Sequence, residues 1–440
     1  MADIQSDQPN GNSAQQAAAP FRFLWYAGEW PTALSALRHA NFRYFWFGQL
    51  ISLIGTWMQN TAQAWLVYEL AFRDVGPVSA PFYVGIIGAL GSAPMFLLIL
   101  FAGVVADRYN RRHILIATQT CLMLLAAGLA VLVGTGHIQL WHVAVFAVLS
   151  GLTMAFDMPT RQTFVKDMAS PKDLLNAIAL NSSIFNLARI IGPGVAGVLM
   201  GIKSVGVPGV LYINAASYLA VIAGLILIRY RPASLLSKAG SVWAHLIEGF
   251  RYAYHHRVIR LILIIMAIYS VFGFSYAVLM PVFASQVLNQ AERGFGLLVA
   301  STGFGAFIGA IFLASTAHRA RKGRVLLAGG LICCIALIIF SRSTSFYLSM
   351  ALVPFIGAGL VVASASINSM VQEIVPDHLR GRVVSIWAFI FAGFAPIGAL
   401  YAGAVARALT APAAVLIGAL VCLLTLAYIS ARAGWLWNLE

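Results

Sequence analysis

The chain has 440 residues, of which 60% are hydrophobic and only 10% are charged, and its mean hydropathy is +0.85. This composition lies far outside the range of soluble globular domains and predicts a polytopic membrane protein. The formal net charge is +14, but the basic residues are dispersed over alternate loops without a recognition motif, so we expect no nucleic-acid partner.

Residues 1–20 are rich in Ala, Gln, Ser and Asn and contain no apolar core. This is typical of a disordered tail rather than of a signal peptide. We interpret residues 1–40 as a cytoplasmic N-terminal segment, and we expect the first membrane span to target and anchor the chain.

Twelve apolar runs follow, each long enough to cross a bilayer as a helix, which needs about 20 residues. Barrel strands would be about half as long and would alternate in polarity, so an all-α integral membrane fold with twelve transmembrane helices is predicted. The expected spans are 44–69, 82–105, 113–134, 140–158, 175–200, 208–228, 258–287, 295–316, 325–341, 346–372, 382–407 and 412–431.

The first span carries a polar stripe whose members are three or four residues apart: Gln49, Ser52, Thr56, Gln59 and Gln63, with Asn60 beside them. Unpaired amides in hydrocarbon are costly. The stripe is therefore expected to line a central aqueous cavity or to contact polar groups on a neighbouring helix.

A basic turn separates the second and third spans, with the sequence Gly103-Val-Val-Ala-Asp107-Arg108-Tyr-Asn110-Arg111-Arg112. Asn110 can adopt the left-handed backbone conformation that such a turn often needs. The arginines are expected to anchor the turn against anionic lipid headgroups.

In the fourth span, Asp157 and Arg161 are four residues apart, so they can form an ion pair on one helix face. In the fifth span, Arg189 lies too deep to reach the interface easily, and an arginine at that depth is costly unless it faces a cavity or a partner. It is expected to bind an anionic group of a substrate or to form a polar network with Asn186, one turn away. A structural arginine bonded to backbone carbonyls is the alternative.

Residues 229–257 form a connector in which Trp243, Leu246, Ile247, Phe250 and Tyr254 share one helical face, so a helix on the membrane surface or on the bundle is expected. Tyr269 and Tyr276 in the seventh span, and Ser364 and Asn368 in the tenth, are candidates for the same path as the polar stripe. Aromatic residues are also ordinary membrane core.

The second half of the chain repeats the first. Ala106-Asp107-Arg108 is echoed by Ala317-His318-Arg319, and Pro171-Lys-Asp173-Leu174 is echoed by Pro376-Asp377-His-Leu379. We expect six-helix bundles at 41–228 and 258–431 and a tail at 432–440. Lys and Arg concentrate in the loops on the side of the basic turn, which predicts that both termini are cytoplasmic.

Two parallel six-helix halves with this basic turn resemble the major facilitator superfamily. Its loop signature, G-x-x-x-D-R-x-G-R-[RK], is matched at Gly103, Asp107, Arg108, Arg111 and Arg112, with Asn110 replacing a glycine. The segments 56–65, 157–162 and 176–193 further resemble the enterobactin-exporter-like branch of multidrug and siderophore efflux carriers. That resemblance implies export across the bacterial cytoplasmic membrane.

The resemblance also implies roles for several residues. Asp157 is expected to meet Arg108 or Arg112 when the cytoplasmic side is closed, with Asp107, Arg111 and Arg161 in the same gate; a fixed topology anchor is the alternative. Gly192-Pro193 resembles a proton-antiporter signature, with Ala188 and Ala196 replacing glycines, or else serves ordinary small-residue packing.

We therefore expect a monomeric secondary transporter that exports small amphipathic, drug-like or siderophore-like molecules by alternating access in exchange for protons. No phosphate loop, hydrolase motif or metal-ligand spacing occurs, so no enzyme activity, cofactor or metal is expected. Glu69 is the first candidate for the proton site, although its helical angle lies away from the polar stripe and it can equally be a simple interfacial carboxylate. The alternatives are a lysophospholipid flippase of the same fold and a non-transporting membrane sensor.

Overall fold

The computed structural model describes residues 32–228, 242–316 and 321–435, and the structural statements below concern these ranges. The expected tail at 1–20, most of the connector before residue 242, and the echo at His318 and Arg319 lie outside them. Within these ranges, the surroundings of Gly103 and the side chains of Asp107, Trp243, Leu246 and Ile247 are not described.

The described chain is helical throughout, as the composition predicts. Its elements are η1 (Thr32–Arg38), α1 (Ala40–Arg108), α2 (Arg111–Gly134), α3 (Leu140–Met168), α4 (Leu174–Met200), α5 (Gly206–Leu227), α6 (Val242–His255), α7 (Arg257–Ile268), η2 (Tyr269–Gly273), α8 (Tyr276–Val282), η3 (Phe283–Val287), α9 (Glu292–Thr316), α10 (Lys322–Arg342), α11 (Phe346–Ile374), α12 (Asp377–Gly393), α13 (Ala395–Ala408) and α14 (Ala411–Ala433).

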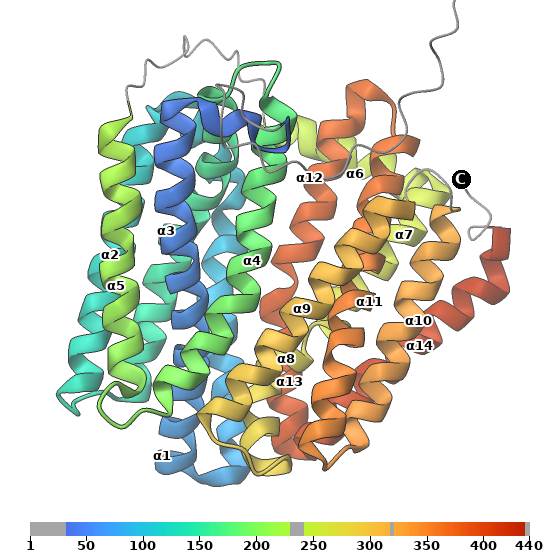
Figure 1. Cartoon of the computed structure of the whole chain (residues 1–440). Helices are drawn as coiled ribbons and strands as arrows, with labels where there is room; N and C mark the ends of the chain where they lie inside the picture. Colours follow the sequence, from blue (N-terminus) through green and yellow to red (C-terminus); the bar gives the residue numbers. More distant parts are fainter. Residues whose placement is uncertain (1–31, 229–241, 317–320, 436–440) are drawn as a thin grey trace, which may run out of the picture.

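The helices form two bundles side by side, α1–α5 and α7–α14 (Figure 1). Eleven helical ranges within the described chain are long and apolar enough to cross a membrane. The first of them, Ala40–Leu98, has 59 residues, which is enough for two crossings at 1.5 Å per residue. The predicted all-α fold with twelve crossings is thereby confirmed.

The first two crossings differ from the expectation in one respect, because no loop separates them. Helix α1 runs from Ala40 to Arg108 and is broken only at Gly76, where φ is 80° and ψ is 171°. This positive φ is the region that glycine enters without a steric penalty, and Pro77 follows it. The expected spans 44–69 and 82–105 are therefore two limbs of one helical hairpin.

The basic turn also departs from its expected backbone. Asn110 has φ −62° and ψ 110°, so it is extended rather than left-handed. It serves instead as the N-cap of α2, where its side-chain oxygen accepts a hydrogen bond of 3.0 Å from the backbone N–H of Arg112. The polar side chain, and not backbone tolerance, explains why this residue suits the turn.

The seventh and eleventh crossings are interrupted. The seventh is built from α7 and α8 with the π-helical turns η2 and η3, and the eleventh breaks at Phe394, between α12 and α13. The Ser270 hydroxyl in η2 donates a hydrogen bond of 3.0 Å to the carbonyl of Phe391, near the end of α12. The two interruptions therefore lie side by side and are joined.

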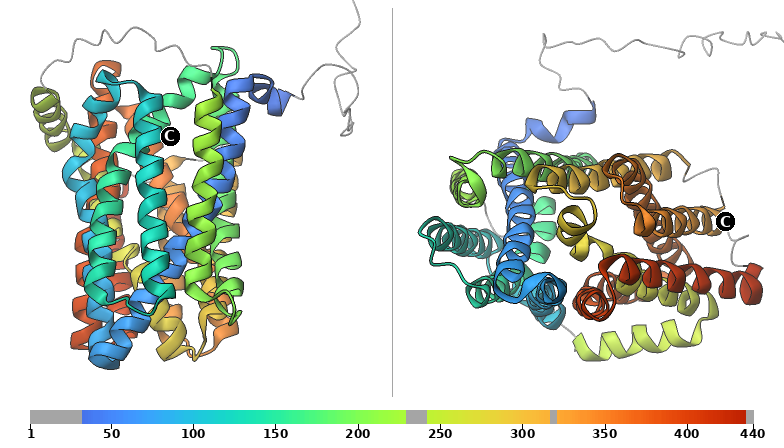
Figure 2. Two further views of the ribbon diagram at one scale, coloured as in Figure 1. Left: turned by 90° about the vertical axis from the view of Figure 1, so that its left-hand side faces the viewer. Right: turned by 90° about the horizontal axis from the view of Figure 1, so that it is seen from below.

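Helix α6 lies across one end of the second bundle. In Figure 2 it is seen lengthwise in the view that shows the spanning helices end-on. Its Glu248 forms an ion pair with Arg382 of α12, and Gly249 lies against the same arginine. We call this end of the molecule the α6 end, and the opposite end, where α1 turns, the Gly76 end.

The two bundles pack tightly at the Gly76 end. A Cβ added to Gly403 of α13 would lie 3.0 Å from the Cα of Gly85 in α1, and a similar glycine contact joins α4 to α9. Two hydrogen bonds also link the bundles there: the Tyr68 hydroxyl donates to Ser285, and the Gln286 amide donates to the carbonyl of Pro77, at 2.9 and 3.2 Å. Small residues thus allow close backbone approach between the halves.

Candidate functional site

A cavity of about 580 Å³ lies within the first bundle and reaches α8 of the second. Its wall combines carboxamides, hydroxyls, methionines and small residues, and the described residues of the lining include no Asp, Glu, Lys, Arg or His. The lining residues are Thr56, Gln59, Asn60, Gln63, Ala64, Val67, Val84, Ile87, Gly88, Gly91, Ser92, Met95, Leu122, Ala147, Ser150, Gly151, Met154, Tyr218, Ala277 and Val278.

Part of the polar stripe of the first crossing lines this cavity. Thr56, Gln59, Asn60 and Gln63 line it. Gln59 also accepts a hydrogen bond of 2.5 Å from the side-chain amide of Asn214 in α5, which is fully buried. The two expectations for the stripe, cavity lining and contact with a neighbouring helix, therefore coexist on one face.

Several residues of the cavity lining were not among the candidates predicted from the sequence. Tyr218 of α5 is buried, and its hydroxyl lies 3.4 Å from that of Thr56. The spacing of Asn214, Ser217 and Tyr218 on one helical face was the available signal, since it places three polar groups inside an apolar span. Met95 and Met154 carry no comparable signal, because methionine is common in membrane core.

Asp157 lies at the centre of a buried polar cluster. Its carboxylate accepts from Arg161 of the same helix, at 3.0 Å from Nε and 2.5 Å from Nη2. Two residues of α2 complete the contacts: the Thr118 hydroxyl donates at 2.8 Å and the Gln119 amide at 2.7 Å. The i,i+4 pair was predicted, whereas the two α2 partners were not.

The arginines of the basic turn have other partners. Arg111 pairs with Asp167 at the end of α3, at 2.9 Å. Arg112 donates to the carbonyls of Leu225 and Ile226, at 2.6 and 2.7 Å, and so satisfies the exposed carbonyls at the end of α5. The expected contact between Asp157 and Arg108 or Arg112 is not made in this conformation, in which Asp157 is held by Arg161, Thr118 and Gln119.

Arg189 lies at the contact between the bundles. Its Nη2 donates to Asn186 Oδ1 at 2.9 Å, and its buried Nε has no hydrogen-bond partner among the described residues. The guanidinium is close enough to Tyr276 of α8 to interact with it electrostatically. A Cβ added to Gly303 of α9 would lie 2.7 Å from the Arg189 carbonyl oxygen, so the second bundle touches this backbone directly.

Gly192 and Pro193 are both buried in α4. A Cβ added to Gly192 would lie 2.6 Å from the Cβ of Trp57 in α1, so this glycine allows α4 to pack against the first crossing. A Cβ added to Gly296 of α9 would likewise lie 2.6 Å from the Pro193 carbonyl oxygen. The pair thus lies between the first crossing and the second bundle.

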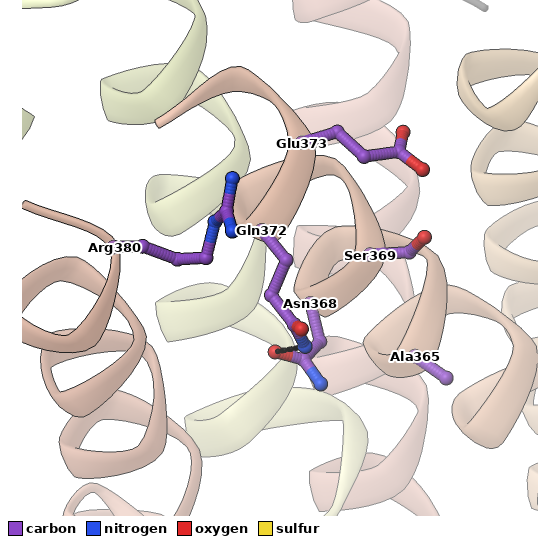
Figure 3. Close-up of a pocket in the computed structure, with 6 residues that line it drawn as sticks. All are labelled: Ala365, Asn368, Ser369, Gln372, Glu373 and Arg380. Atoms are coloured by element: carbon purple, nitrogen blue, oxygen red, sulfur yellow. Dashed lines mark hydrogen bonds between the residues drawn. The ribbon is translucent and has the colours of Figure 1, made fainter. Parts of the chain in front are cut away.

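The candidates of the second bundle do not share one site. The Tyr269 hydroxyl is buried and donates to the carbonyl of Gly330 at 3.0 Å, and Ser364 donates to the carbonyl of Val361 at 3.3 Å. Asn368 lines a separate hollow of about 560 Å³, where it accepts a hydrogen bond of 3.2 Å from Gln372 (Figure 3). The other residues of this hollow are Ala365, Ser369, Glu373 and Arg380.

Glu69 is exposed and lies near the end of the first limb of α1, beyond the polar stripe and seven positions before Gly76. Its charged neighbours are Arg73 and Glu292. It does not line the cavity.

A second carboxylate, Asp173, ties η1 to the start of α4. It accepts from His39 Nε2 at 2.8 Å, from Arg38 at 2.6 Å and from the Ser170 hydroxyl at 2.9 Å. The hydrogen bond from His39, followed by those from the hydroxyl and guanidinium donors, holds the pKa of Asp173 well below its usual range. This cluster anchors the first described turn to the bundle.

A family model described as transmembrane secretion effector matches residues 31–434. Among curated proteins, the chain is 25% identical over 363 residues to the staphyloferrin A transporter of Staphylococcus aureus, covering 81% of this chain and 87% of the relative. It is 26% identical over 334 residues to the multidrug efflux pump Tap of Mycolicibacterium fortuitum, covering 73% and 80%. It is 22% identical over 360 residues to the enterobactin exporter EntS of Shigella boydii, covering 81% and 83%.

Two solved structures share the fold. A bacterial homologue of the human lysosomal transporter Spinster, in an inward-facing and unoccupied conformation, matches with a TM-score of 0.68 at 15% identity, covering 93% of this chain and 97% of the other. The nucleoside transporter NupG matches with a TM-score of 0.65 at 12% identity, covering 87% and 98%.

Proposed function

Because the chain belongs to the transmembrane secretion effector family, within the major facilitator superfamily of multi-pass membrane transporters, we propose that it exports small amphipathic molecules from the cytoplasm in exchange for protons. The efflux direction is supported by relatives that are named as a multidrug efflux pump and as an enterobactin exporter. Transport would proceed by alternating access in the cytoplasmic membrane of a bacterium, with a monomer as the working unit.

The observation that carries the proposal is the cavity of the first bundle. It places three carboxamides, Gln59, Asn60 and Gln63, opposite methionine and aliphatic side chains in a space of about 580 Å³. Such a wall suits a drug-sized molecule that has both polar and apolar faces, since pockets of this kind combine an apolar lining with a few polar groups. The described lining residues are uncharged, which favours recognition by hydrogen bonds and shape.

Arg189 supports a second element of recognition. It is a deep intramembrane cation that no described carboxylate neutralises, and its Nε is buried without a partner. In hydrocarbon such a charge is costly, and a substrate anion would offset that cost. We infer that Arg189 and Asn186 bind an anionic group of those substrates that carry one, with Tyr276 of the opposite bundle beside them.

The arrangement of the bundles supports an alternating mechanism. Glycine contacts and hydrogen bonds close the Gly76 end, whereas at the α6 end Leu175 of α4 and Phe312 of α9 are 83% and 52% exposed. Between the ends, Phe96 and Phe389 meet across the bundles with ring centroids 4.8 Å apart. The basic residues at the starts of α2 and α12 favour a cytoplasmic α6 end, so we infer that this form is closed on the outer side.

The remaining roles belong to the same proposal. The residues of the basic turn, Gly103, Asp107, Arg108, Arg111 and Arg112, would form the gate of the α6 end, and both termini would lie on that side. The bundles at 41–228 and 258–431 would rock about the cavity, with the segment 229–257 joining them. Gly192 and Pro193 would lie at the moving contact.

The test uses inside-out membrane vesicles with an acidic lumen, so that export carries a probe inward. We expect accumulation of staphyloferrin A, enterobactin or ethidium that requires the protein and is abolished by a protonophore. Gln63→Leu should weaken it, whereas Gln372→Leu, a matched amide in the other hollow, should not. Movement of a labelled lysolipid that ignores the gradient, with no accumulation of soluble probes, would replace this proposal with a flippase.

A further inference from the structure

One carboxylate of the described chain lies well inside a spanning helix, α3, and is almost completely buried. Asp157 lies eleven positions before Met168, the end of α3, or about 16 Å along the helix axis. Its exposure is 1%. Glu69, the candidate favoured by the sequence alone, is exposed near the Gly76 turn, so burial distinguishes the two acids.

The cluster around Asp157 has donors for a charged carboxylate. Arg161 supplies two N–H groups, and Thr118 and Gln119 supply one donor each. An ion pair in a low-dielectric interior needs such additional hydrogen bonds to offset its desolvation. In the conformation described here the deprotonated form is therefore well accommodated.

The same cluster has unused capacity for a protonated form. Gln119 Oε1, an acceptor, is buried and has no hydrogen-bond partner within the described ranges; Arg161 Nη1 is likewise without one but is a donor, so it offers nothing to an O–H group. A protonated carboxyl carries an O–H donor, which a deprotonated one lacks. The free amide oxygen of Gln119 is an acceptor of the required kind within the same side chain that already contacts Asp157, so a flip of this amide can satisfy the protonated form.

The cluster is directly connected to the cavity wall. Met154, one turn before Asp157, and Leu122, one turn after Gln119, both line the cavity. Tyr218 lines it too, interacts electrostatically with both Asp157 and Arg161, and lies 3.4 Å from Thr56 of α1. A change of charge at Asp157 would therefore change the electrostatic potential at the cavity wall on α3 and α5.

The geometry points to Asp157 as the carboxylate that carries the coupling proton, with Arg161 as its counter-ion. This inference rests on the proposed proton-coupled export and identifies its proton site. Asp157 takes up a proton when the cavity opens at the Gly76 end and releases it when the cavity opens at the α6 end. Arg161 stays protonated throughout, and its ion pair with Asp157 forms and breaks in turn.

The other groups that face Asp157 do not compete for this role. Thr118 and Gln119 on α2 are not titratable near neutral pH, and arginine is not deprotonated in proteins. The remaining facing group, Tyr218 on α5, belongs to a residue type that ordinarily titrates near pH 10. Among these facing groups, Asp157 supplies the carboxylate that a proton-binding role needs.

The experiment compares two activities of purified protein in proteoliposomes, with ethidium and staphyloferrin A as probes. One is accumulation driven by a pH gradient, and the other is exchange of probe across the membrane at equal pH. One pH unit supports an accumulation ratio of about ten for each proton exchanged. Asp157→Asn should reduce that ratio to about one and leave exchange within about twofold of wild type. Asp377→Asn, an exposed carboxylate variant at the start of α12, should keep both activities.

Any of three transport results would overturn the inference. The first is full accumulation in Asp157→Asn, and the second is loss of accumulation in Glu69→Gln but not in Asp157→Asn. Both leave proton-coupled export intact. The third applies if Asp157→Asn fails to exchange probe because Arg161 is left unpaired. If the double variant with Asp157→Asn and Arg161→Gln then restores both activities, the carboxylate only neutralises the arginine.

Restoration of exchange alone in that double variant supports the inference. If neither variant exchanges probe, carboxyl infrared absorption of the reconstituted wild type is compared between neutral and acidic pH. A titrating carboxyl band that Asp157→Asn removes supports the assignment, and an unchanged band overturns it. A wild type that never responds to a pH gradient is a different result, because it rejects the coupling mechanism itself.

Discussion

Gly197 of α4 and Gly296 of α9 touch backbone to backbone across the two bundles: a Cβ added to Gly296 would lie 2.6 Å from the Cα of Gly197. We expect Gly197→Ala to open the Gly76 end, because overpacking of this kind costs about 1–3 kcal/mol. The ratio of conformers should change by about 5- to 150-fold. Thiol labelling of a cysteine placed near Glu292 measures the change.

Gly194 of the same helix provides the matched control. A Cβ there would lie 3.6 Å from the Cβ of Ala300, which is an ordinary van der Waals contact. Gly194→Ala should therefore label like the parent protein. Equal labelling in the two alanine variants would show that the glycine contact does not hold this end closed.

The side-chain amides of Gln59 and Asn60 in α1 should differ in how much they contribute to protein stability. Gln59→Leu leaves the buried amide of Asn214 without its 2.5 Å partner, and an unsatisfied buried polar group costs about 1–3 kcal/mol. Asn60 is exposed to the cavity, so Asn60→Leu should change the KM for a transported probe with little loss of stability. Thermal unfolding in detergent and transport kinetics separate the two effects, and an equal loss of stability in both variants would contradict the assignment.

The charge of Arg189 should select among substrates. Arg189→Gln is expected to reduce transport of anionic carboxyfluorescein by about 10- to 150-fold, the range for loss of a hydrogen bond to a charged group of about 1.5–3 kcal/mol. Cationic ethidium should be unaffected or better transported. Arg189→Lys should recover part of the anion transport, and Arg293→Gln, at an exposed arginine of the Gly76 end, serves as the control. Parallel loss of both probes would indicate a structural arginine.

The start of α4 should lose stability in acid. Because the folded-state pKa of Asp173 is lowered by His39 and its other donors, its contribution is present above the ordinary aspartate pKa of about 3.9 and is lost as the pH falls through the folded value. Asp173→Asn should abolish this dependence. Proteolysis of the segment between α3 and α4 as a function of pH measures it.

Asp377 lies at the start of α12, the corresponding helix of the second half, one position before the residue that aligns with Asp173 in the repeat. Its side chain is 87% exposed, and the ion pair that it forms among the described residues is with Arg380. Exposed pairs contribute little, so Asp377→Asn should leave proteolysis of the corresponding segment unchanged at every pH tested. An acid-dependent change of similar size in both variants would assign the effect to general acid unfolding.

The sequence predicted those features that depend on composition and on spacing within one helix. Span count, the amide stripe of Gln59 and Gln63, and the pairing of Asp157 with Arg161 are of this kind. Contacts between spans could not be predicted in the same way, because a helix that is apolar on all sides does not indicate which face meets which neighbour. The α2 partners of Asp157 and the bond from Asn214 to Gln59 depend on such contacts.

Local geometry at single residues accounts for the other differences between the predicted and the observed structure. Gly76 replaces a whole loop by one residue with a positive φ, and Asn110 acts through its side chain. Neither choice alters the hydropathy profile from which the spans were predicted. The separation of Asn368 from the cavity likewise depends on how α11 is rotated within the second bundle.

The π-helical turn η2 has a consequence for the helical wheel of the seventh span. Such a turn accommodates one residue more than α-helical geometry does, and each residue of an α-helix advances the wheel by about 100°. Residues after Gly273 are therefore turned by about that angle from where an unbroken wheel would place them, so Tyr269 and Tyr276, seven apart, do not share the face that their spacing implies. Deleting a single residue from η2 would rotate the rest of the span, including the two α8 residues that close the cavity, Ala277 and Val278.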